Sequence, residues 1–239
     1  MTSLALTAAQ NAALDNPIWA SLTTAHRHLA KGDAAVRRYP AQIAPFAAFA
    51  QETSRASEEL RALAGDGPVV LFTPAPVAPI DGLVVELQAP IRQMAFAGAP
   101  GASSATFETL GAADVPAMLE LTALTKPGPF SPRTHELGRY IGVRHGDRLV
   151  AMAGERMRFD RCTEVSAVCV HPDHRGKGYA AMLIKALVKA IADRGESSFL
   201  HVFDNNQNAI ALYHRLGFAA RAALQVTVLR RSDGVSLAL

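Results

Sequence analysis

The fold is decided by residues 168–180, which read VCVHPDHRGKGYA. Residues 163–170 are rich in β-branched and small apolar side chains, and Pro172 follows closely, so they predict a strand. Over residues 179–191 the apolar side chains recur at the spacing of a helix. The stretch therefore predicts a strand, a glycine-rich turn and a helix in direct succession.

The turn has the properties of a phosphate-binding loop. The first N–H groups of a helix have no partner within the helix, and the helix dipole is positive at that end. Gly176 and Gly178 allow the backbone to approach a bulky anion, while Arg175 and Lys177 add two positive charges. The spacing predicts that residues 175–178 bind an anion.

Two common phosphate-binding motifs fit this loop poorly. A P-loop is excluded, because His171 and Gly178 stand where that motif needs a glycine and a serine or threonine. A dinucleotide-binding fingerprint fits residues 176–181 loosely, but residues 171–175 separate the predicted strand from the first glycine, where that motif has an immediate turn. A dinucleotide-dependent enzyme is therefore the weaker alternative.

A second pattern follows the predicted helix. Residues 198–203 predict a strand, and the Asp-Asn-Asn at residues 204–206 supplies N-cap residues for another helix, which Gly217 ends. Residues 206–218 carry the pattern Asn-x-x-Ala-x-x-Leu-Tyr-x-x-Leu-Gly-Phe. The chain thus repeats the succession of strand, turn and helix.

Together the two patterns resemble those of the GNAT superfamily of N-acetyltransferases. Arg175, Gly178 and Ala180 meet the pattern Arg-x-x-Gly-x-Ala, which is similar to the acyl-CoA pyrophosphate loop of that family, and residues 206–218 look like its closing motif. The resemblance covers the chain from about residue 106 to the C-terminus. It implies an α/β fold, with a mixed, mostly antiparallel sheet flanked by helices.

The small, flexible residues 97–104 mark a boundary between two parts of the chain. We predict an N-terminal α/β domain at residues 1–97, a linker at 98–104 and an acetyltransferase domain at 105–239. The smaller first domain could be a degenerate GNAT-like copy, although it lacks the Arg-x-x-Gly-x-Ala loop. Its predicted helices are residues 17–30, 43–49 and 54–63, and its predicted strands are residues 69–72 and 83–87.

Three further elements are predicted in the second domain. Residues 140–144 and 149–153 flank His-Gly-Asp-Arg, which is a strong signal for a hairpin. Residues 125–132 form a proline-rich loop, and the corresponding loop of the family helps to form the acceptor pocket. Residues 225–229 predict the last strand.

The resemblance also implies which residues act in the reaction. Tyr213 matches the position credited with protonating the departing thiolate, although its spacing also fits a core tyrosine. Glu164 stands where many relatives keep a carboxylate that deprotonates the amine, but it could instead pair with Arg156 or Arg158. The residues expected to bind acetyl-CoA are Val168, Cys169, Val170, Arg175, Gly176, Lys177, Gly178, Tyr179, Ala180, Asn206 and Ala209.

Alternation along the predicted strand places Glu164 on one face and Cys169 on the other. Cys169 is therefore expected to be a buried apolar residue and not an acyl carrier. His171 and His174 flank a turn without a third ligand, so no metal site is expected. The N–H of Val170 is expected to face the thioester oxygen, as the resemblance implies.

Composition narrows the classes of protein. Of the 239 residues 49% are hydrophobic and 19% charged, as in globular proteins, and the net charge of +3 comes without a Lys/Arg run that would indicate a nucleic-acid partner. Cys162 and Cys169 give no disulfide framework, and no apolar run is long enough to span a membrane. A cytoplasmic protein without a leader segment is expected.

These observations predict an acetyl-CoA-dependent N-acetyltransferase in which an amine attacks directly in a ternary complex. The amine would belong to a small molecule or a peptide, because the acceptor loops carry no recognisable code. The alternative from another class is an acyl-CoA-binding sensor or pseudoenzyme that keeps the phosphate loop without turnover. The length of the acyl group and the oligomeric state stay open.

Overall fold

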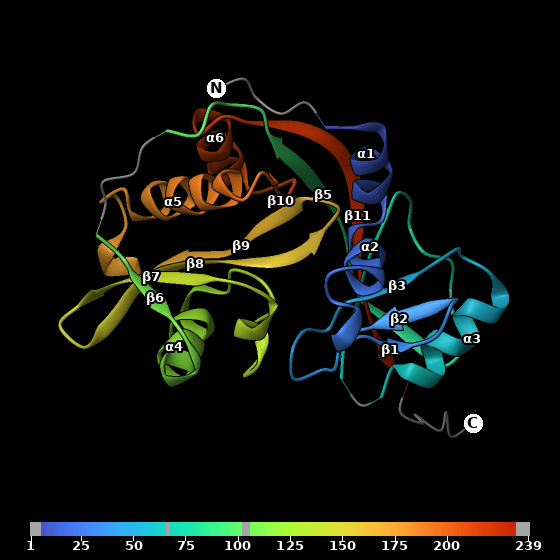
Figure 1. Ribbon diagram of the computed structural model, residues 1–239. Coiled ribbons are helices and arrows are strands. Elements are labelled where there is room, and N and C mark those ends of the chain that lie inside the picture. The colour runs from blue at the N-terminus through green and yellow to red at the C-terminus, as the bar shows by residue number, and fades with distance from the viewer. Residues whose placement is uncertain (1–5, 66, 102–105, 233–239) are drawn as a thin grey trace.

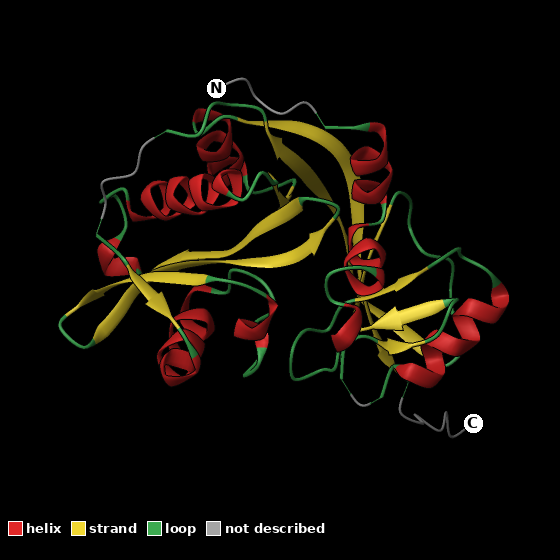
Figure 2. Cartoon of the chain, in the orientation of Figure 1, coloured by secondary structure: helices red, strands yellow, loops and turns green. Residues whose placement is uncertain are grey.

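The computed structural model describes residues 6–65, 67–101 and 106–232. They form an eight-stranded sheet, a separate three-stranded sheet and six α-helices (Figure 1). In the part of the molecule built on the eight-stranded sheet, the strands lie in the middle and the helices lie outside them (Figure 2). This confirms the predicted fold class, a mixed and mostly antiparallel sheet flanked by helices. Within the described residues no helix is both long and apolar enough to cross a membrane.

The elements follow one another along the chain as helices, strands and short 3-10 turns. The α-helices are α1 (Ala8–Asp15), α2 (Pro17–Thr23), α3 (Ser54–Leu63), α4 (Val115–Thr125), α5 (Tyr179–Asp193) and α6 (Gln207–Arg215). The strands are β1 (Lys31–Gly32), β2 (Val36–Arg38), β3 (Ala47–Phe49), β4 (Val69–Thr73), β5 (Leu83–Phe96), β6 (Glu108–Leu110), β7 (Tyr140–His145), β8 (Arg148–Phe159), β9 (Cys162–Val170), β10 (Ser197–Phe203) and β11 (Phe218–Arg231). The 3-10 turns are η1 (Arg27–Leu29), η2 (Ala112–Asp114), η3 (Thr134–Leu137) and η4 (Pro172–His174).

The larger sheet has the strand order β4-β11-β5-β10-β9-β8-β7-β6. Its neighbouring strands are antiparallel, except β9 and β10, which run parallel. Strand β5 lies between β11 and β10, although it precedes the predicted linker in the chain. The predicted domain boundaries stay a prediction, and residues 102–104 of that linker lie outside the described residues.

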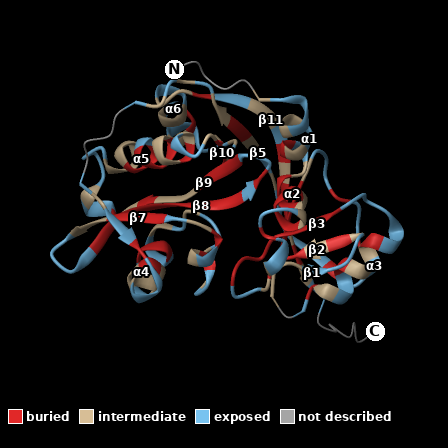
Figure 3. Ribbon diagram, in the orientation of Figure 1, coloured by how far each residue is buried: buried red, intermediate tan, exposed pale blue. Residues whose placement is uncertain are grey.

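Helices cover both faces of strands β7 to β9 (Figure 1). On one side, which we call the α5 face, Leu187 of α5 shares a hydrophobic cluster with Ala153 of β8 and Val165 of β9. On the other side, the α4 face, Met118 of α4 shares a cluster with Met152 of β8. Because both faces are covered, nearly all of β8 is buried (Figure 3).

The N-terminal part shares a core with the larger sheet. One cluster contains Ile18 of α2 and Phe46, together with Phe159 of β8 and Phe199 of β10. The buried Thr134 hydroxyl, at the start of η3, donates a hydrogen bond of 2.6 Å to the carbonyl oxygen of residue 43. The first hundred residues therefore pack directly on the strands of the predicted second domain.

Most of the predicted elements are present, but the helix expected at residues 17–30 ends at Thr23, with the short η1 at residues 27–29, and the helix expected at residues 43–49 is wrong. The predicted helix at residues 54–63, the strands at 69–72 and 83–87 and the hairpin after residue 140 are confirmed. Residues 43–49 were expected to be helical, but they contain β3, which pairs with β2. The helix propensity of alanine is small compared with the stabilisation that strand pairing in the folded protein provides. In addition, Pro45 cannot donate the N–H that a helix interior needs.

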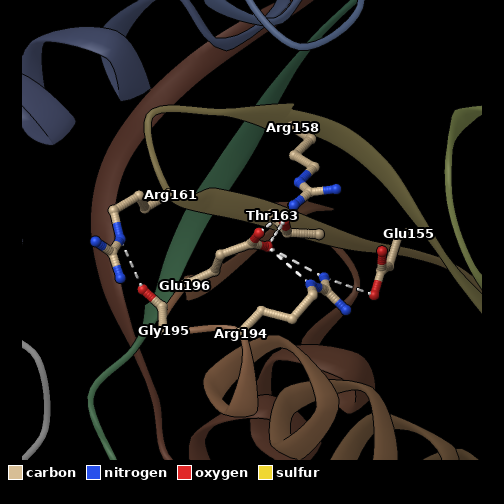
Figure 4. A network of polar contacts seen from close by, with 7 residues as sticks. All are labelled: Glu155, Arg158, Arg161, Thr163, Arg194, Gly195 and Glu196. Carbon is tan, nitrogen blue, oxygen red and sulfur yellow. Dashed lines mark hydrogen bonds and ion pairs between the residues drawn. The ribbon is translucent and has the colours of Figure 1, made fainter.

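A buried carboxylate ties the start of β9 to the end of α5 (Figure 4). Glu196 accepts hydrogen bonds from the Thr163 hydroxyl at 2.6 Å and from Arg194 Nη2 at 3.1 Å, and it also pairs with Arg158. Arg194 pairs in addition with Glu155 of β8 at 3.0 Å. Burial would raise the pKa of Glu196, but these partners outweigh it and lower the pKa, so the group stays ionised.

Gly154 of β8 provides a test of packing on the α4 face. A Cβ at this position would stand 2.2 Å from Cε1 of Tyr140, so Gly154→Ala should destabilise the protein by about 1–3 kcal/mol in denaturant unfolding. Gly111→Ala is the control, because its Cβ would meet no atom within 4 Å and its φ is −135°. Equal stability of the two variants would contradict this packing.

Candidate active site

Strands β9 and β10 are paired only at their beginnings. The register joins Cys162 to Ser197, Thr163 to Ser198 and Glu164 to Phe199. Beyond that point β9 continues over residues 165–170 and β10 over residues 200–203 without pairing to each other. We call these two unpaired segments the fork. Their facing backbone groups need other hydrogen-bond partners, which an extended, amide-containing ligand can supply.

A β-bulge lies in the β9 arm of the fork. Met152 of β8 pairs with Cys169 and Gly154 pairs with Ser166, so β9 has one residue more than β8 in this interval. The extra residue, Ala167, has a φ of +51°, which is unusual for a residue with a side chain. The bulge re-aims the residues that follow it.

The bulge corrects the alternation expected from the sequence. Val165, before the bulge, lies on the α5 face, so Glu164 points to the α4 face. After the bulge Cys169 lies on the α4 face as well, while Val168 and Val170 pack toward the α5 face. The expectation that Glu164 and Cys169 occupy opposite faces is therefore wrong, because strict alternation holds only in a strand without a bulge.

The backbone of the β9 arm alternates between β8 and the fork. The N–H of His171 donates to the carbonyl oxygen of Val150 in β8 at 2.8 Å. In an antiparallel ladder the preceding N–H points the other way, so the N–H of Val170 points into the fork. This is the orientation required for the predicted contact with a thioester oxygen.

The glycine loop follows the β9 arm directly. Gly176 and Gly178 have φ values of +76° and +80°, which favour glycine, and a Cβ at either position would meet nothing within 4 Å. Gly178 is the N-cap of α5, and Arg175 and Lys177 are exposed. Among the described residues no carboxylate pairs with either cation. The predicted anion-binding loop therefore has open space, free charge and a helix start.

The other predicted cofactor residues lie at the starts of α5 and α6. Tyr179 and Ala180 open α5, and the Tyr179 hydroxyl is 2.7 Å from Nε2 of His145 in the β7–β8 hairpin. Asn206 caps α6, since its Oδ1 accepts a hydrogen bond from the N–H of Ala209 at 3.2 Å. Asn206 is exposed. Ala209 is half-buried and packs against the hydrophobic cluster on the α5 face.

Tyr213 is half-buried on α6 and packs on the same cluster as Val168 and Val170 of the fork. Its ring is 6.1 Å from that of Phe218. Burial raises the pKa of Tyr213 to about 12, so its hydroxyl keeps its proton near neutral pH. The structure thus places a protonated phenol against the hydrophobic cluster that includes Val168 and Val170 of the fork.

Glu164 lies at the last paired position before the fork and is completely buried. Its Oε2 accepts a hydrogen bond of 2.7 Å from Arg156 Nε, and its Oε1 accepts one of 2.6 Å from Arg156 Nη2. His201 Nδ1 is 2.7 Å from the same Oε1. The ring of Phe46 packs 4.6 Å below the Arg156 guanidinium. Of the two arginines considered as partners, Arg156 forms the pair.

This environment strongly favours the charged form of Glu164. Burial alone would raise the pKa of the carboxyl, but the charge and hydrogen bonds of Arg156, with the hydrogen bond from His201, lower it to about 2. A carboxylate with so low a pKa is a weak base. The predicted role of Glu164 in deprotonating the amine stays a prediction, and the observed contacts are those of a structural ion pair.

A hydrogen-bond chain that the sequence analysis missed fixes the orientation of His201. Gln93 Nε2 donates to the carbonyl oxygen of Leu14 at 2.9 Å, and its Oε1 accepts from Arg221 Nη1 at 2.8 Å. The amide orientation is thereby determined, so the Nε2 of His201, 3.1 Å from Gln93 Nε2, must accept. The His201 proton is then on Nδ1 and is donated to Glu164.

His171, Cys162 and Cys169 are buried, and their surroundings do not indicate a metal-binding or acyl-carrying role. His171 is buried, and its Nδ1 accepts a hydrogen bond of 3.2 Å from the N–H of Asp173. No group of three or more metal-ligating side chains is present in the described part of the chain. Burial raises the pKa of both Cys162 and Cys169 to about 11, which disfavours either thiol as an acyl carrier near neutral pH.

Known proteins are similar to this chain in sequence and fold. The family described as FR47-like protein matches residues 140–227. A solved structure from Novosphingobium aromaticivorans, assigned to the GNAT family of acetyltransferases, is 39% identical, with a TM-score of 0.86 over 92% of this chain and 98% of its own. The GCN5-related N-acetyltransferase from Kribbella flavida shares the fold, with 18% identity and a TM-score of 0.60 over 91% of this chain and 95% of its own. No curated protein has significant sequence similarity to the chain.

Glu164→Gln tests the buried ion pair. The substitution should lower the free energy of unfolding by about 3–5 kcal/mol, because Arg156 would keep its charge without a counter-charge. The matched control is Glu136→Gln, which removes an equally bidentate pair with Arg133 at an exposed site and should change stability by less than about 1 kcal/mol. Denaturant unfolding at neutral pH measures both.

The pH dependence of the same variants gives a second measurement. A folded pKa of about 2, below the usual 4.5, means that Glu164 contributes stability above pH 4.5 and loses it as the pH falls toward 2. The difference in Tm between the wild type and Glu164→Gln should therefore shrink across that window. A difference that is constant with pH would show that the carboxylate charge is not the source of the stability.

Proposed function

The chain belongs to the GNAT family of acetyltransferases, and on that basis we propose that it transfers an acetyl group from acetyl-CoA to an amine. The observation that carries the proposal is the fork between β9 and β10, whose β9 arm leads into the glycine loop at the start of α5. A fork can hydrogen-bond a chain of amides, and the loop can bind a pyrophosphate. Acetyl-CoA combines these two groups in one molecule.

Three segments of the chain would bind acetyl-CoA in this proposal. The backbone of residues 168–170 would pair with the amides of the pantetheine arm, with the Val170 N–H directed at the thioester oxygen. The loop and first helical turn at residues 175–180 would hold the pyrophosphate. Asn206 and Ala209, where β10 leads into α6, would contact the cofactor from the other arm.

Tyr213 would act on the departing thiolate as a hydrogen-bond donor. A thiol has a pKa of roughly 8.5, whereas the pKa of Tyr213 is about 12. Complete transfer of the proton from the phenol would therefore be unfavourable in the closed core, and a hydrogen bond to the developing negative charge is the more effective contribution. The thiolate would take its final proton from water.

We further propose that the amine attacks the thioester directly, because both cysteines are buried thiols of raised pKa. Glu164 would either receive the amine proton or hold Arg156 and His201 in place at the base of the fork. The rate of Glu164→Gln as a function of pH separates these roles. A rate loss that disappears at high pH supports proton removal, and one that persists supports positioning.

Thermal unfolding with acetyl-CoA, coenzyme A or NADH tests the cofactor. A ligand at 100 times its Kd adds about 2.7 kcal/mol, which corresponds to a rise in Tm of roughly 5–10 °C in a chain of this size. We expect this shift with the two CoA compounds and not with NADH. Gly178→Val should abolish the shift, because φ of +80° excludes a β-branched side chain without rearrangement of the loop. The absence of a shift in the wild type would overturn the proposal.

Tyr213→Phe tests the contribution of the phenol. We expect kcat to fall about 10- to 100-fold while the Kd of acetyl-CoA changes less than twofold, because the hydroxyl would act on charge that develops only during the reaction. Steady-state kinetics and calorimetry measure the two quantities. An unchanged kcat would remove Tyr213 from the mechanism and leave it as a core residue.

A further inference from the structure

Tyr140, the first residue of β7, has a buried hydroxyl group without a hydrogen-bond partner. The residue is 1% exposed, and its hydroxyl oxygen makes no hydrogen bond to any described residue. Tyr39 is buried to the same extent, but its hydroxyl is 2.9 Å from both the Ser21 hydroxyl and His26 Nδ1. The contrast shows that this fold can satisfy a buried tyrosine, so the unpaired group on Tyr140 requires an explanation.

The ring of Tyr140 extends from β7 over Gly154 of β8, on the side of the sheet where β9 follows. The Tyr140 ring lies on Gly154 of β8, with Cε1, Cδ1 and Cζ at 2.2, 2.3 and 2.6 Å from the position of a Cβ there. Gly154 pairs with Tyr140 of β7 on one side and with Ser166 of β9 on the other. A ring that extends from β7 across Gly154 carries its hydroxyl toward β9.

On the α4 face the ring of Tyr140 packs among apolar side chains, while the charges of Arg156 and Glu164 act on its hydroxyl. Tyr140 shares its cluster with Met118, Met152 and Cys169, and Ala167 packs against it. Burial raises the pKa of Tyr140 far above its ordinary range, so the group stays a neutral hydroxyl that can both donate and accept. Phe130, in the proline-rich loop, covers the ring at 5.7 Å in an edge-on arrangement.

We propose that the Tyr140 hydroxyl is the hydrogen-bond partner of the acceptor amine. The inference rests on the acetyl transfer proposed above and on the acceptor pocket that the family resemblance implies at the proline-rich loop, and it adds the residue that holds the amine. The neutral hydroxyl accepts an N–H of the amine and orients the nitrogen lone pair toward the thioester held by β9. The ring of Phe130 packs against that of Tyr140, so the acceptor would displace Phe130 to reach the hydroxyl. The apolar cluster fits an acceptor whose amine is attached to an apolar group.

Tyr140→Phe, with Tyr39→Phe as the matched control, tests this assignment. For Tyr140→Phe we expect an unchanged or higher Tm, because the lost hydroxyl had no partner, and a Kd for acetyl-CoA within about twofold of the wild type. The kcat/KM for the amine should fall at least about tenfold. For Tyr39→Phe we expect the reverse: a Tm lower by several degrees and an unchanged kcat/KM.

Amine-dependent release of coenzyme A from saturating acetyl-CoA is the activity measured, with phenethylamine, tyramine, lysine and spermidine as probes. Phenethylamine and tyramine should be better acceptors than spermidine. The inference is overturned if Tyr140→Phe lowers Tm as much as Tyr39→Phe does, if its kcat/KM is unchanged, or if none of the four amines is acetylated by wild type that binds acetyl-CoA. Failure of the proposed function itself is distinguished by the absence of any thermal shift with acetyl-CoA.

Discussion

The buried charge of Glu164 is the constraint on which the central strands depend. A carboxylate without access to water is tolerated only where an opposite charge and hydrogen bonds surround it. Arg156 supplies the charge from β8, and His201 supplies a further hydrogen bond from β10. Phe46 and Phe72 of the N-terminal part lie against the guanidinium. One ion pair therefore links three strands and the N-terminal part at the position where β9 and β10 separate.

A second buried carboxylate, that of Glu196, contacts the same part of β9 from the opposite face of the sheet. Thr163 and Glu164 are consecutive in β9, so their side chains point to opposite sides of the sheet. Thr163 binds Glu196, which is also paired with Arg194 at the end of α5. The paired residues just before the fork are thus held on both faces of the sheet. The fork can therefore present backbone groups to a ligand while the sheet itself stays intact.

Much of the region from residue 163 to residue 218 could be predicted from the sequence, because caps, glycine spacing and apolar period are local signals. The bulge could not, because alanine gives no sign of a positive φ and only pairing with β8 imposes it at Ala167. The environment of Glu164 was equally inaccessible. Regular alternation would put Arg156 and Arg158 on the same face, and a bulge in β8 between residues 155 and 158 decides which one faces the carboxylate. The segment at residues 43–49 shows long-range pairing overriding helix propensity.

The position of β5 in the sheet also determines when its pairing with β10 and β11 can form during synthesis of the chain. On the ribosome β5 is made before both of its neighbours, since β10 and β11 follow it by more than a hundred residues. Until those segments emerge, both edges of this long strand are unpaired, and it also exposes Val84, Val85 and Leu87. The eight-stranded sheet can be completed only after translation has passed residue 231. In nascent chains halted earlier, both edges of β5 stay unpaired, and such edges favour aggregation.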